Sequence, residues 1–202
     1  MDPQKTAAGY DQIAQWWQTQ HQASRYGVAA LEKALQFVVK RGSAIDIGCG
    51  SSGRFMEILI QQGFQPEGLD ISAEMIRLAQ QRHPDRSFHH ADVCTWTPPR
   101  QYSLIIAWDS TFHLPLPQQE PVTRKLCGAL EPEGVFLFSG GGGPTGGKIS
   151  GAFREQVFEY SSLGSNGFLR VIDECGCTCQ HLEYDQYPLN HVYWVVQKVA
   201  VS

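Results

Sequence analysis

The hydrophobic pattern alternates between short segments predicted as strands and longer amphipathic segments. The short segments lie at residues 44–47, 65–70, 87–92, 102–108 and 135–139. Segments with helical spacing of apolar residues separate most of them, at about residues 52–62, 72–83 and 118–130. Strands that alternate with helices form parallel β-α-β units, so we expect a Rossmann-like, doubly wound α/β sheet with helices on both faces.

Both ends of the chain depart from this alternation. A helical region from about Tyr10 to Lys40 precedes the first strand, and a glycine-rich stretch (140–147) and an irregular segment through Ser165 follow the fifth. A short helix near 168–174 and two strands, 177–184 and 191–199, end the pattern. The connection 185–190 is too short for a crossover, so these strands should pair antiparallel. We therefore expect seven strands, mostly parallel with an antiparallel last strand, in a single domain with a helical cap (1–40) and a core (41–202).

Composition and charge narrow the function classes. The chain has 202 residues, of which 42% are hydrophobic, enough for one sizeable core. A net charge of -4 and the lack of a Lys/Arg cluster argue against nucleic-acid binding and favour a small-molecule partner. No apolar run approaches the length that spans a bilayer, and the first residues lack the apolar core of a signal peptide. We expect a cytoplasmic protein without a membrane partner; the oligomeric state stays open.

The six cysteines do not indicate a metal centre. Cys49, Cys94 and Cys127 are scattered singly, and only Cys175, Cys177 and Cys179 cluster. Their spacing in a predicted strand differs from the two-residue gap of a zinc knuckle. We expect no metal site and inert, reduced thiols.

A glycine turn after the first strand is the strongest candidate site. Gly48, Gly50 and Gly53 follow the strand and precede a helix. Glycine allows a tight turn and close approach of a ligand to the backbone, and a helix N-terminus points unpaired N–H groups into the same space. The spacing alone also fits a dinucleotide site, so neighbouring residues must discriminate.

Three aspartates at successive strand ends supply that discrimination. Asp46 lies inside the first strand, where its charge would repel a pyrophosphate but attract an amine. Asp70 ends the second strand, where an acid can accept the hydroxyls of an adenosine ribose. Asp92 ends the third and could accept a hydrogen bond from the adenine amine. Together they suggest one adenosine-bearing ligand with a cationic head.

Four short motifs resemble those of the class I S-adenosylmethionine-dependent methyltransferases. They are Asp46-Ile-Gly-Cys-Gly50, Gly68-Leu-Asp-Ile-Ser72, Ala91-Asp92-Val93 and Leu130-Glu-Pro-Glu-Gly134. The resemblance runs from about residue 10 to 199 and is greatest to bacterial small-molecule methyltransferases, whose fourth strand enters a segment like 106–114. The last motif departs from the usual Pro-Gly-Gly, but Glu133 is easily tolerated in a solvated turn.

This resemblance implies methyl transfer from S-adenosyl-L-methionine to a small molecule, with S-adenosyl-L-homocysteine as product. It implies that the glycine turn holds the methionine end, the acid after the second strand the ribose, and the acid after the third strand the adenine. The cofactor-binding residues expected on this basis are Asp46, Gly48, Cys49, Gly50, Gly53, Asp70, Ile71, Met75, Asp92, Val93 and Trp108.

Methyl transfer needs alignment and a dry pocket more than a catalytic triad, and the sequence contains no triad. If a proton must leave the acceptor, His113 just beyond the fourth strand is the best-placed base, although it could equally cap or pack. Trp108 is expected to form a pocket wall. The remaining aromatic candidates for the pocket could also be ordinary core or surface residues: Tyr10, Trp16, Trp17, Tyr26, Tyr184, Tyr187 and, with them, His191.

Two other functions fit part of the pattern. A nicotinamide (NAD) oxidoreductase would use a similar glycine turn, but Asp46, the lack of a Tyr-x-x-x-Lys pair and the antiparallel last strand disfavour it. A non-catalytic sensor of S-adenosylmethionine would keep every cofactor motif, so the sequence leaves it open. The loop 185–190 could contact the acceptor, and the stretch 140–147 could serve as a lid or as a flexible tether.

Overall fold

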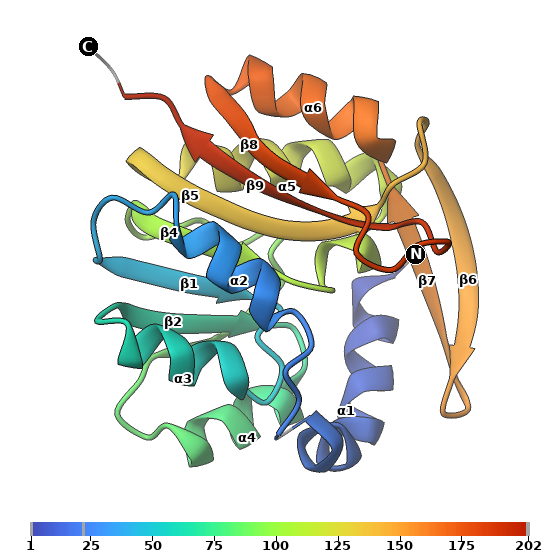
Figure 1. The fold of residues 1–202 in the computed structure, drawn as a ribbon. Helices are drawn as coiled ribbons and strands as arrows, with labels where there is room; N and C mark the ends of the chain where they lie inside the picture. Colours follow the sequence, from blue (N-terminus) through green and yellow to red (C-terminus); the bar gives the residue numbers. More distant parts are fainter. Residues whose placement is uncertain (1, 22, 201–202) are drawn as a thin grey trace.

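The computed structural model describes residues 2–21 and 23–200, and a seven-stranded sheet forms its centre (Figure 1). The strand order is β3-β2-β1-β4-β5-β9-β8. The strands are β1 (Ser43–Ile47), β2 (Gln65–Asp70), β3 (Phe88–His90), β4 (Tyr102–Ala107), β5 (Leu130–Gly141), β8 (Cys177–Glu183) and β9 (His191–Lys198). The first five are parallel, and β9 pairs antiparallel with β5 and β8. The predicted fold class is therefore confirmed, including the antiparallel last strand.

Helices cover both faces of the sheet. On one face, α2 (Val28–Leu35) and α3 (Arg54–Gln61) pack on apolar side chains of β4, β5 and β9. On the other, α5 (Leu116–Gly128) and α6 (Gly164–Glu174) pack around Phe138 and Trp194. Because β4 is covered on both sides, each of its residues is buried. This burial fixes the strand ends, where the loops of the site begin.

The leading helical region forms two helices that pack differently. The first, α1 (Pro3–His21), contacts α4 (Ala73–Arg82) and lies outside the sheet core, whereas α2 belongs to that core. Gly27, with a φ of 78°, provides the turn into α2. The division into a cap at 1–40 and a core stays a prediction, and residues 1 and 22 lie outside the described part.

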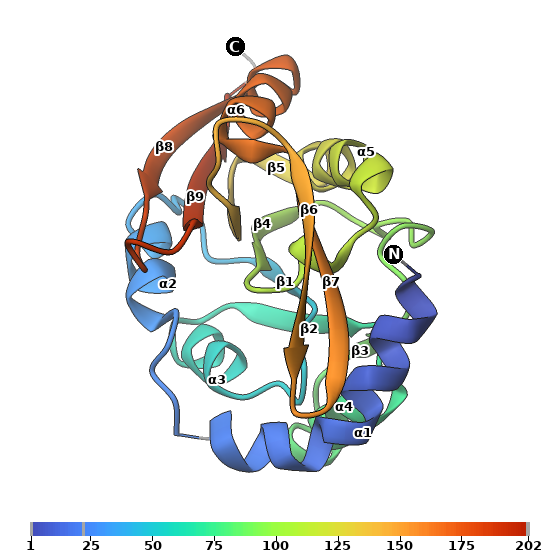
Figure 2. The same ribbon diagram turned by 90° about the vertical axis from the view of Figure 1, so that its right-hand side faces the viewer.

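The segment predicted as irregular contains a β-hairpin, so that prediction was wrong. Strands β6 (Gly147–Phe153) and β7 (Gln156–Ser162) pair antiparallel and form a separate two-stranded sheet. Phe158 of β7 is buried against Tyr10 of α1, a contact that stabilises the hairpin but leaves no local sequence signal. Figure 2 shows the hairpin and α1 on the same side of the molecule, where α1 contacts β7.

Local signals set most boundaries. Ser72 caps α4 as predicted, because its Oγ accepts a hydrogen bond from the Met75 amide at 3.1 Å. Helix α3 begins at Arg54 and not near Ser52, with Gly53 as its N-cap. A 3₁₀ helix, η1 (Thr111–His113), follows β4. Within the described residues, no helix combines the length and the apolar character needed to cross a membrane.

Candidate active site

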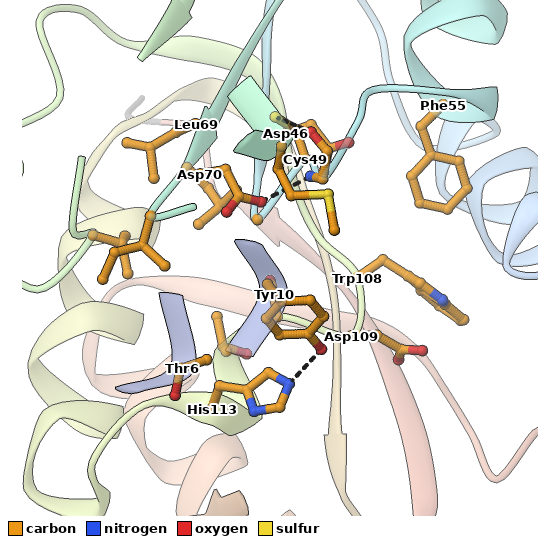
Figure 3. A pocket seen from close by; sticks show the side chains of 18 of the residues that line it. Thr6, Tyr10, Asp46, Cys49, Phe55, Leu69, Asp70, Trp108, Asp109 and His113 are labelled. Carbon is orange, nitrogen blue, oxygen red and sulfur yellow. Dashed lines mark hydrogen bonds between the residues drawn. The ribbon is translucent and has the colours of Figure 1, made fainter. Parts of the chain in front are cut away.

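A cavity opens at the carboxyl ends of β1 to β4, between these strand ends and α1. Every residue that the sequence predicted for cofactor binding, together with His113, lines this cavity. Figure 3 shows Asp46 and Asp70 on one side of it, Tyr10 and His113 on the opposite side, and Trp108 and Asp109 at the right of the view. The structure thus brings the predicted site residues together, while their individual roles stay predictions.

The glycine turn is held mainly by its own amides. The amides of Gly48 and Cys49 donate to the Leu69 carbonyl at 2.7 and 3.0 Å, and the Gly50 amide donates to Asp70 Oδ2 at 2.8 Å. These three amides bind the turn to β2. Gly48 has a φ of 75°, and a Cβ added to it would lie 2.2 Å from the Cβ of Ser110. The turn therefore requires glycine both for its conformation and for space.

Asp70 is oriented by two backbone amides. Its Oδ1 accepts from the Ser72 amide at 2.9 Å, and its Oδ2 accepts from Gly50. Burial raises the pKa of this carboxyl, and the hydrogen bonds from Ser72 and Gly50 act in the opposite direction. Each carboxylate oxygen keeps lone pairs for further donors. The side chain can therefore accept the hydroxyl groups of a ligand without losing its position.

Asp46 is buried in β1 beside a cation that the sequence analysis missed. Burial raises the pKa of Asp46 to about 7, and nearby Arg54 opposes that rise. The Nε of Arg54 donates to the Tyr26 carbonyl at 2.5 Å, and its guanidinium lies 4.9 Å from the centre of the Phe55 ring. A basic residue at the first position of the helix after Gly53 was the available signal. A ligand with a positive and a negative group would find partners here.

The loop after β3 is fixed by a lysine from α5. Lys125 Nζ donates to the carbonyls of Val93, Cys94 and Trp96 at 2.8, 2.9 and 2.8 Å. Asp92 Oδ1 accepts from the Cys94 amide at 2.8 Å, which tightens the same turn. These contacts hold Asp92 and Val93 at the cavity wall. Sequence reasoning missed Lys125, because it lies about thirty residues from the loop that it binds.

His113 lies next to Tyr10 on one side of the cavity, and its hydrogen-bond partners define its protonation. Its Nδ1 lies 3.3 Å from the Glu159 carbonyl, which can only accept, so Nδ1 donates there. Its Nε2 is then the acceptor for the Tyr10 hydroxyl at 2.9 Å (Figure 3). Burial lowers the pKa of His113 to about 4, so the ring is neutral at neutral pH. An acceptor molecule would meet the Nε2 lone pair only through Tyr10.

The segment after β4 carries two buried polar atoms that point to a ligand. Trp108 Nε1 and Ser110 Oγ are buried and have no hydrogen-bond partner in the described part of the chain. Both residues line the cavity. Native proteins rarely leave such groups unsatisfied. A polar ligand in the cavity could form hydrogen bonds with these two side chains, and it would lie next to the glycine turn and the aspartates.

The His191 imidazole bridges Asp109, which lines the cavity, and Asp185, which does not. His191 Nε2 lies 2.8 Å from Asp109 Oδ1, and its Nδ1 lies 2.5 Å from Asp185 Oδ1. Burial lowers the pKa of His191, but the hydrogen bonds to both carboxylates outweigh this and leave the pKa raised. Both ring nitrogens can donate only in the imidazolium form, so this positive charge is already paired twice.

The other aromatic candidates divide into two groups. Tyr10, Trp17 and Tyr26 line the cavity, whereas Trp16 packs at 5.6 Å against Phe153 of the hairpin and does not line it. Away from the wall, the Tyr184 hydroxyl donates to the Gly142 carbonyl, and Tyr187 is 85% exposed. Within the described residues, no cluster of three or more His, Cys, Asp or Glu side chains is arranged to hold a metal ion.

Comparison with known proteins agrees with this geometry. Residues 44–134, which span β1 to the start of β5, match a family model described as a methyltransferase domain. This segment of the chain is therefore similar to a methyltransferase domain. The match confirms the resemblance drawn from the four motifs, and the matched segment contains all the predicted site residues.

Curated relatives match part of this chain over part of their own length. Trans-aconitate 2-methyltransferase from Rhodopseudomonas palustris (strain BisB18) is 37% identical over 93 residues, which are 45% of this chain and 35% of the relative. The dTDP-3-amino-3,6-dideoxy-alpha-D-glucopyranose N,N-dimethyltransferase of Streptomyces fradiae is 28% identical over 100 residues, 48% of this chain and 39% of the relative. The matches thus span little more than a third of the relatives' length.

Solved structures resemble nearly the whole chain. An S-adenosylmethionine-dependent methyltransferase from Clostridium acetobutylicum gives a TM-score of 0.72 at 12% identity and covers 95% of this chain and 99% of its own. The DhpI–SAH complex gives a TM-score of 0.69 at 19% identity, covering 97% and 96%. At such identities the comparison establishes the fold, and it extends that fold beyond the matched segment to α1 and the last strands.

Proposed function

We propose that this protein is an S-adenosylmethionine-dependent methyltransferase that acts on a small molecule. The observation that carries the proposal is the placement of Asp46, Asp70 and Asp92 around one cavity, at three successive strand ends beside the Gly48 turn. The methyltransferase family match and the structural neighbours, one of them a complex with SAH, support the same conclusion.

The residues divide the ligand between them in this proposal. Asp70 accepts the ribose hydroxyls, Asp92 accepts from the adenine amine, and Ile71, Met75 and Val93 flank the adenine. Gly48, Cys49, Gly50 and Gly53 bring the backbone close to the methionine end, where Asp46 attracts the ammonium. Arg54 is the matching partner for the carboxylate, because it lines the same cavity and is permanently charged.

The protein contributes mainly alignment to the reaction. S-adenosylmethionine, when bound, supplies a methyl group on a sulfonium sulfur that is already a good leaving group. Orienting the acceptor in line with that methyl group can lower the barrier by roughly 7 to 11 kcal/mol. Trp108 forms a wall of the cavity, and Tyr10 with α1 covers it. His113 can receive a proton through the Tyr10 hydroxyl, which keeps it as the candidate base.

The alternatives are weaker but testable. An NAD oxidoreductase would place a pyrophosphate next to Asp46, whose charge disfavours it. A sensor of S-adenosylmethionine would bind without turnover, and no geometric feature separates it from an enzyme. Trans-aconitate, which the names of several relatives give as substrate, suits this cavity poorly as an acceptor. Its carboxylates would lie beside the aspartates of the cavity. A cytoplasmic location and the absence of a nucleic-acid partner belong to the same proposal.

Calorimetric titration tests the binding part. We expect the protein to bind S-adenosylmethionine and S-adenosylhomocysteine but not NADH. The variant Asp70→Asn should bind both about tenfold or more weakly, because the amide group presents donors where the ribose hydroxyls donate. Asp173→Asn, on the exposed face of α6, is the matched control with unchanged affinity. Equal affinity in wild type and Asp70→Asn would contradict the ribose role.

Turnover tests the catalytic part. Incubation with S-adenosylmethionine carrying a labelled methyl group and with pools of small metabolites should transfer the label to a metabolite and release S-adenosylhomocysteine. Binding without any release would support the sensor. Tyr10→Phe and His113→Gln should each slow the transfer, and the double variant should be no slower than the slower single variant, since both act in one relay.

A further inference from the structure

Asp109 is a carboxylate held in a fixed position at one end of the cavity. Its Oδ1 accepts from Ser139 Oγ and from His191 Nε2, both at 2.8 Å, while its amide donates to the same Ser139 oxygen. Ser139 is fully buried in β5, and His191 begins β9. Two strands of the sheet therefore orient a side chain that the resemblance to methyltransferases did not point to.

The backbone of Asp109 has an unfavourable conformation, which the surrounding contacts maintain. Its φ is 50°, a left-handed conformation that residues other than glycine seldom adopt, although Asp tolerates it better than most. Such conformations persist where surrounding contacts impose them, and they concentrate at functional sites. The conformation directs Asp109 to the cavity wall, where its side chain keeps 28% of its exposure.

The location of Asp109 is the end of the cavity where methyl transfer is proposed. The next residue, Ser110, lies directly against Gly48 of the glycine turn, so the segment after β4 packs on the proposed methionine end. Asp92 marks the adenine end, on the loop after β3. Asp109 is therefore adjacent to the reacting end and not to the nucleoside.

The cavity has more acidic than basic lining residues, which favours a positively charged acceptor. The acidic lining residues of the cavity are Asp46, Asp70, Asp92 and Asp109. Arg54 is the one permanently charged cation among the described lining residues, and it lies beside Asp46. His113 is neutral, and the positive charge of His191 is paired with Asp109 and Asp185. Apart from His21, whose Nδ1 is hydrogen-bonded to the Trp17 carbonyl, no described lining residue is left to balance a carboxylate or phosphate on the acceptor.

Asp109 itself is ionised. Burial raises the pKa of Asp109, but hydrogen bonds from His191, Ser139 and Tyr26 outweigh it, so that the pKa lies below its ordinary range. Aromatic rings surround the position: the rings of Tyr26 and His191 each lie 5.6 Å from that of Trp108. A carboxylate close to a cluster of aromatic rings is a good site for an ammonium group.

We propose that the methyl acceptor is an amine and that the Asp109 carboxylate binds its ammonium group. This inference rests on the proposed methyltransferase function and specifies its substrate class. The ammonium first loses a proton, which the Tyr10 hydroxyl can pass to His113, and the nitrogen lone pair then forms the N–C bond with the transferred methyl group. The C–S bond breaks, and its electron pair stays on the sulfur, which becomes an uncharged thioether.

The test compares three probes of one shape on the protein saturated with S-adenosylhomocysteine. Benzylamine, benzyl alcohol and benzoate carry a positive, a neutral and a negative group on the same ring. Calorimetry at neutral pH should show benzylamine binding at least about tenfold more tightly than the other two. Equal or tighter binding of benzoate or benzyl alcohol, or no detectable binding of benzylamine at millimolar concentration, would overturn the proposal.

Two variants assign the effect to Asp109. Asp109→Asn should weaken benzylamine binding about tenfold or more while S-adenosylhomocysteine affinity changes less than about twofold. Asp185→Asn removes the other carboxylate that holds His191 but lies outside the cavity wall, so it should leave benzylamine binding nearly unchanged. Unchanged benzylamine affinity in Asp109→Asn would refute the assignment. Failure of the wild type to bind S-adenosylhomocysteine would instead refute the methyltransferase function itself.

Discussion

Gly48 shows how a single missing side chain supports the site. The residue combines a left-handed backbone with the contact to Ser110, so Gly48→Ala introduces both strain and a clash. Gly63 has a similar φ of 83° but nothing within 4 Å of an added Cβ, so Gly63→Ala introduces strain alone. We expect Gly63→Ala to lower the free energy of unfolding by about 1 kcal/mol and Gly48→Ala by more than about 2 kcal/mol.

Urea unfolding of both variants measures the difference, and calorimetry with S-adenosylhomocysteine measures its effect on the site. Gly48→Ala should also weaken binding, whereas Gly63→Ala should not. Equal destabilisation by the two substitutions would show that the Ser110 contact contributes nothing.

Asp46 couples stability to ligand binding. Its pKa is raised from 3.8 to about 7 by burial, so the folded protein binds a proton that the unfolded chain has released between these values. Stability should therefore fall as the pH rises through this window. Asp46→Asn removes the ionisation and should stabilise the protein without ligand by on the order of 2 kcal/mol at pH 8, but by little near pH 4.

The same substitution should weaken S-adenosylmethionine binding about tenfold, since the charge that attracts the ammonium is lost. Thermal unfolding at the two pH values and calorimetry at pH 8 measure the two effects. If the variant were less stable than the wild type at pH 8, the buried charge of Asp46 could not be the cause of the loss of stability at high pH.

At the residue scale, the sequence predicted which residues line one cavity, because strand ends fix their positions. A residue that follows a parallel strand must lie on one rim of the sheet, which is enough to bring Asp46, Asp70 and Asp92 together. Arg54 and Asp109 were missed, since their roles depend on partners from distant segments. Ser139 and His191, for example, lie 30 and 82 residues beyond Asp109 in the chain.

At the element scale, α1 covers the cavity because it is attached to two neighbours. Asp11 Oδ1 accepts from Ser72 Oγ at 2.5 Å and from the Glu74 amide at 3.1 Å, which joins α1 to the N-terminus of α4. A carboxylate in this place also interacts favourably with the helix dipole. On its other side α1 packs against the β6–β7 hairpin through Tyr10 and Phe158.

Removal of the Asp11 contacts should loosen this attachment. Asp11→Ala is expected to lower the free energy of unfolding by about 1 to 2 kcal/mol and to weaken S-adenosylmethionine binding several-fold, because α1 closes the cavity. Cleavage by a protease between α1 and α2 should be faster in the variant. Gln15→Ala, on the exposed side of α1, is the control, and a variant protected as well as this control would argue against the attachment.

The β6–β7 hairpin could not be predicted from the sequence, because its local pattern is weak and its contacts are distant in the chain. Its residues 147–153 are mostly exposed and include two glycines, so they lack the alternation that marks a half-buried strand. The alternation of Phe158 and Tyr160 in β7 is short, and its meaning depends on α1 and η1, which lie far away in the sequence. Elements whose burial depends on distant neighbours are those that local patterns identify poorly.

At the scale of the whole molecule, the half-buried His191 and the buried His113 have opposite effects on how stability depends on pH. The pKa of His191 is raised by its two carboxylate partners against the effect of burial. Its contribution is complete below the ordinary pKa and is lost as the pH rises through the raised value. The pKa of His113 is lowered by burial, so the unfolded chain binds a proton that the folded protein does not.

His113 should therefore make the protein sensitive to acid. Between its ordinary pKa of 6.5 and about 4, stability should fall as the pH falls, by on the order of 2 kcal/mol at pH 4.5. His113→Gln cannot titrate and can still pair with Tyr10 and the Glu159 carbonyl. Urea unfolding at pH 7.5, 5.5 and 4.5 should show a smaller loss for this variant than for the wild type. Parallel losses would mean that other groups cause the acid sensitivity and that His113 is solvated enough to be protonated freely.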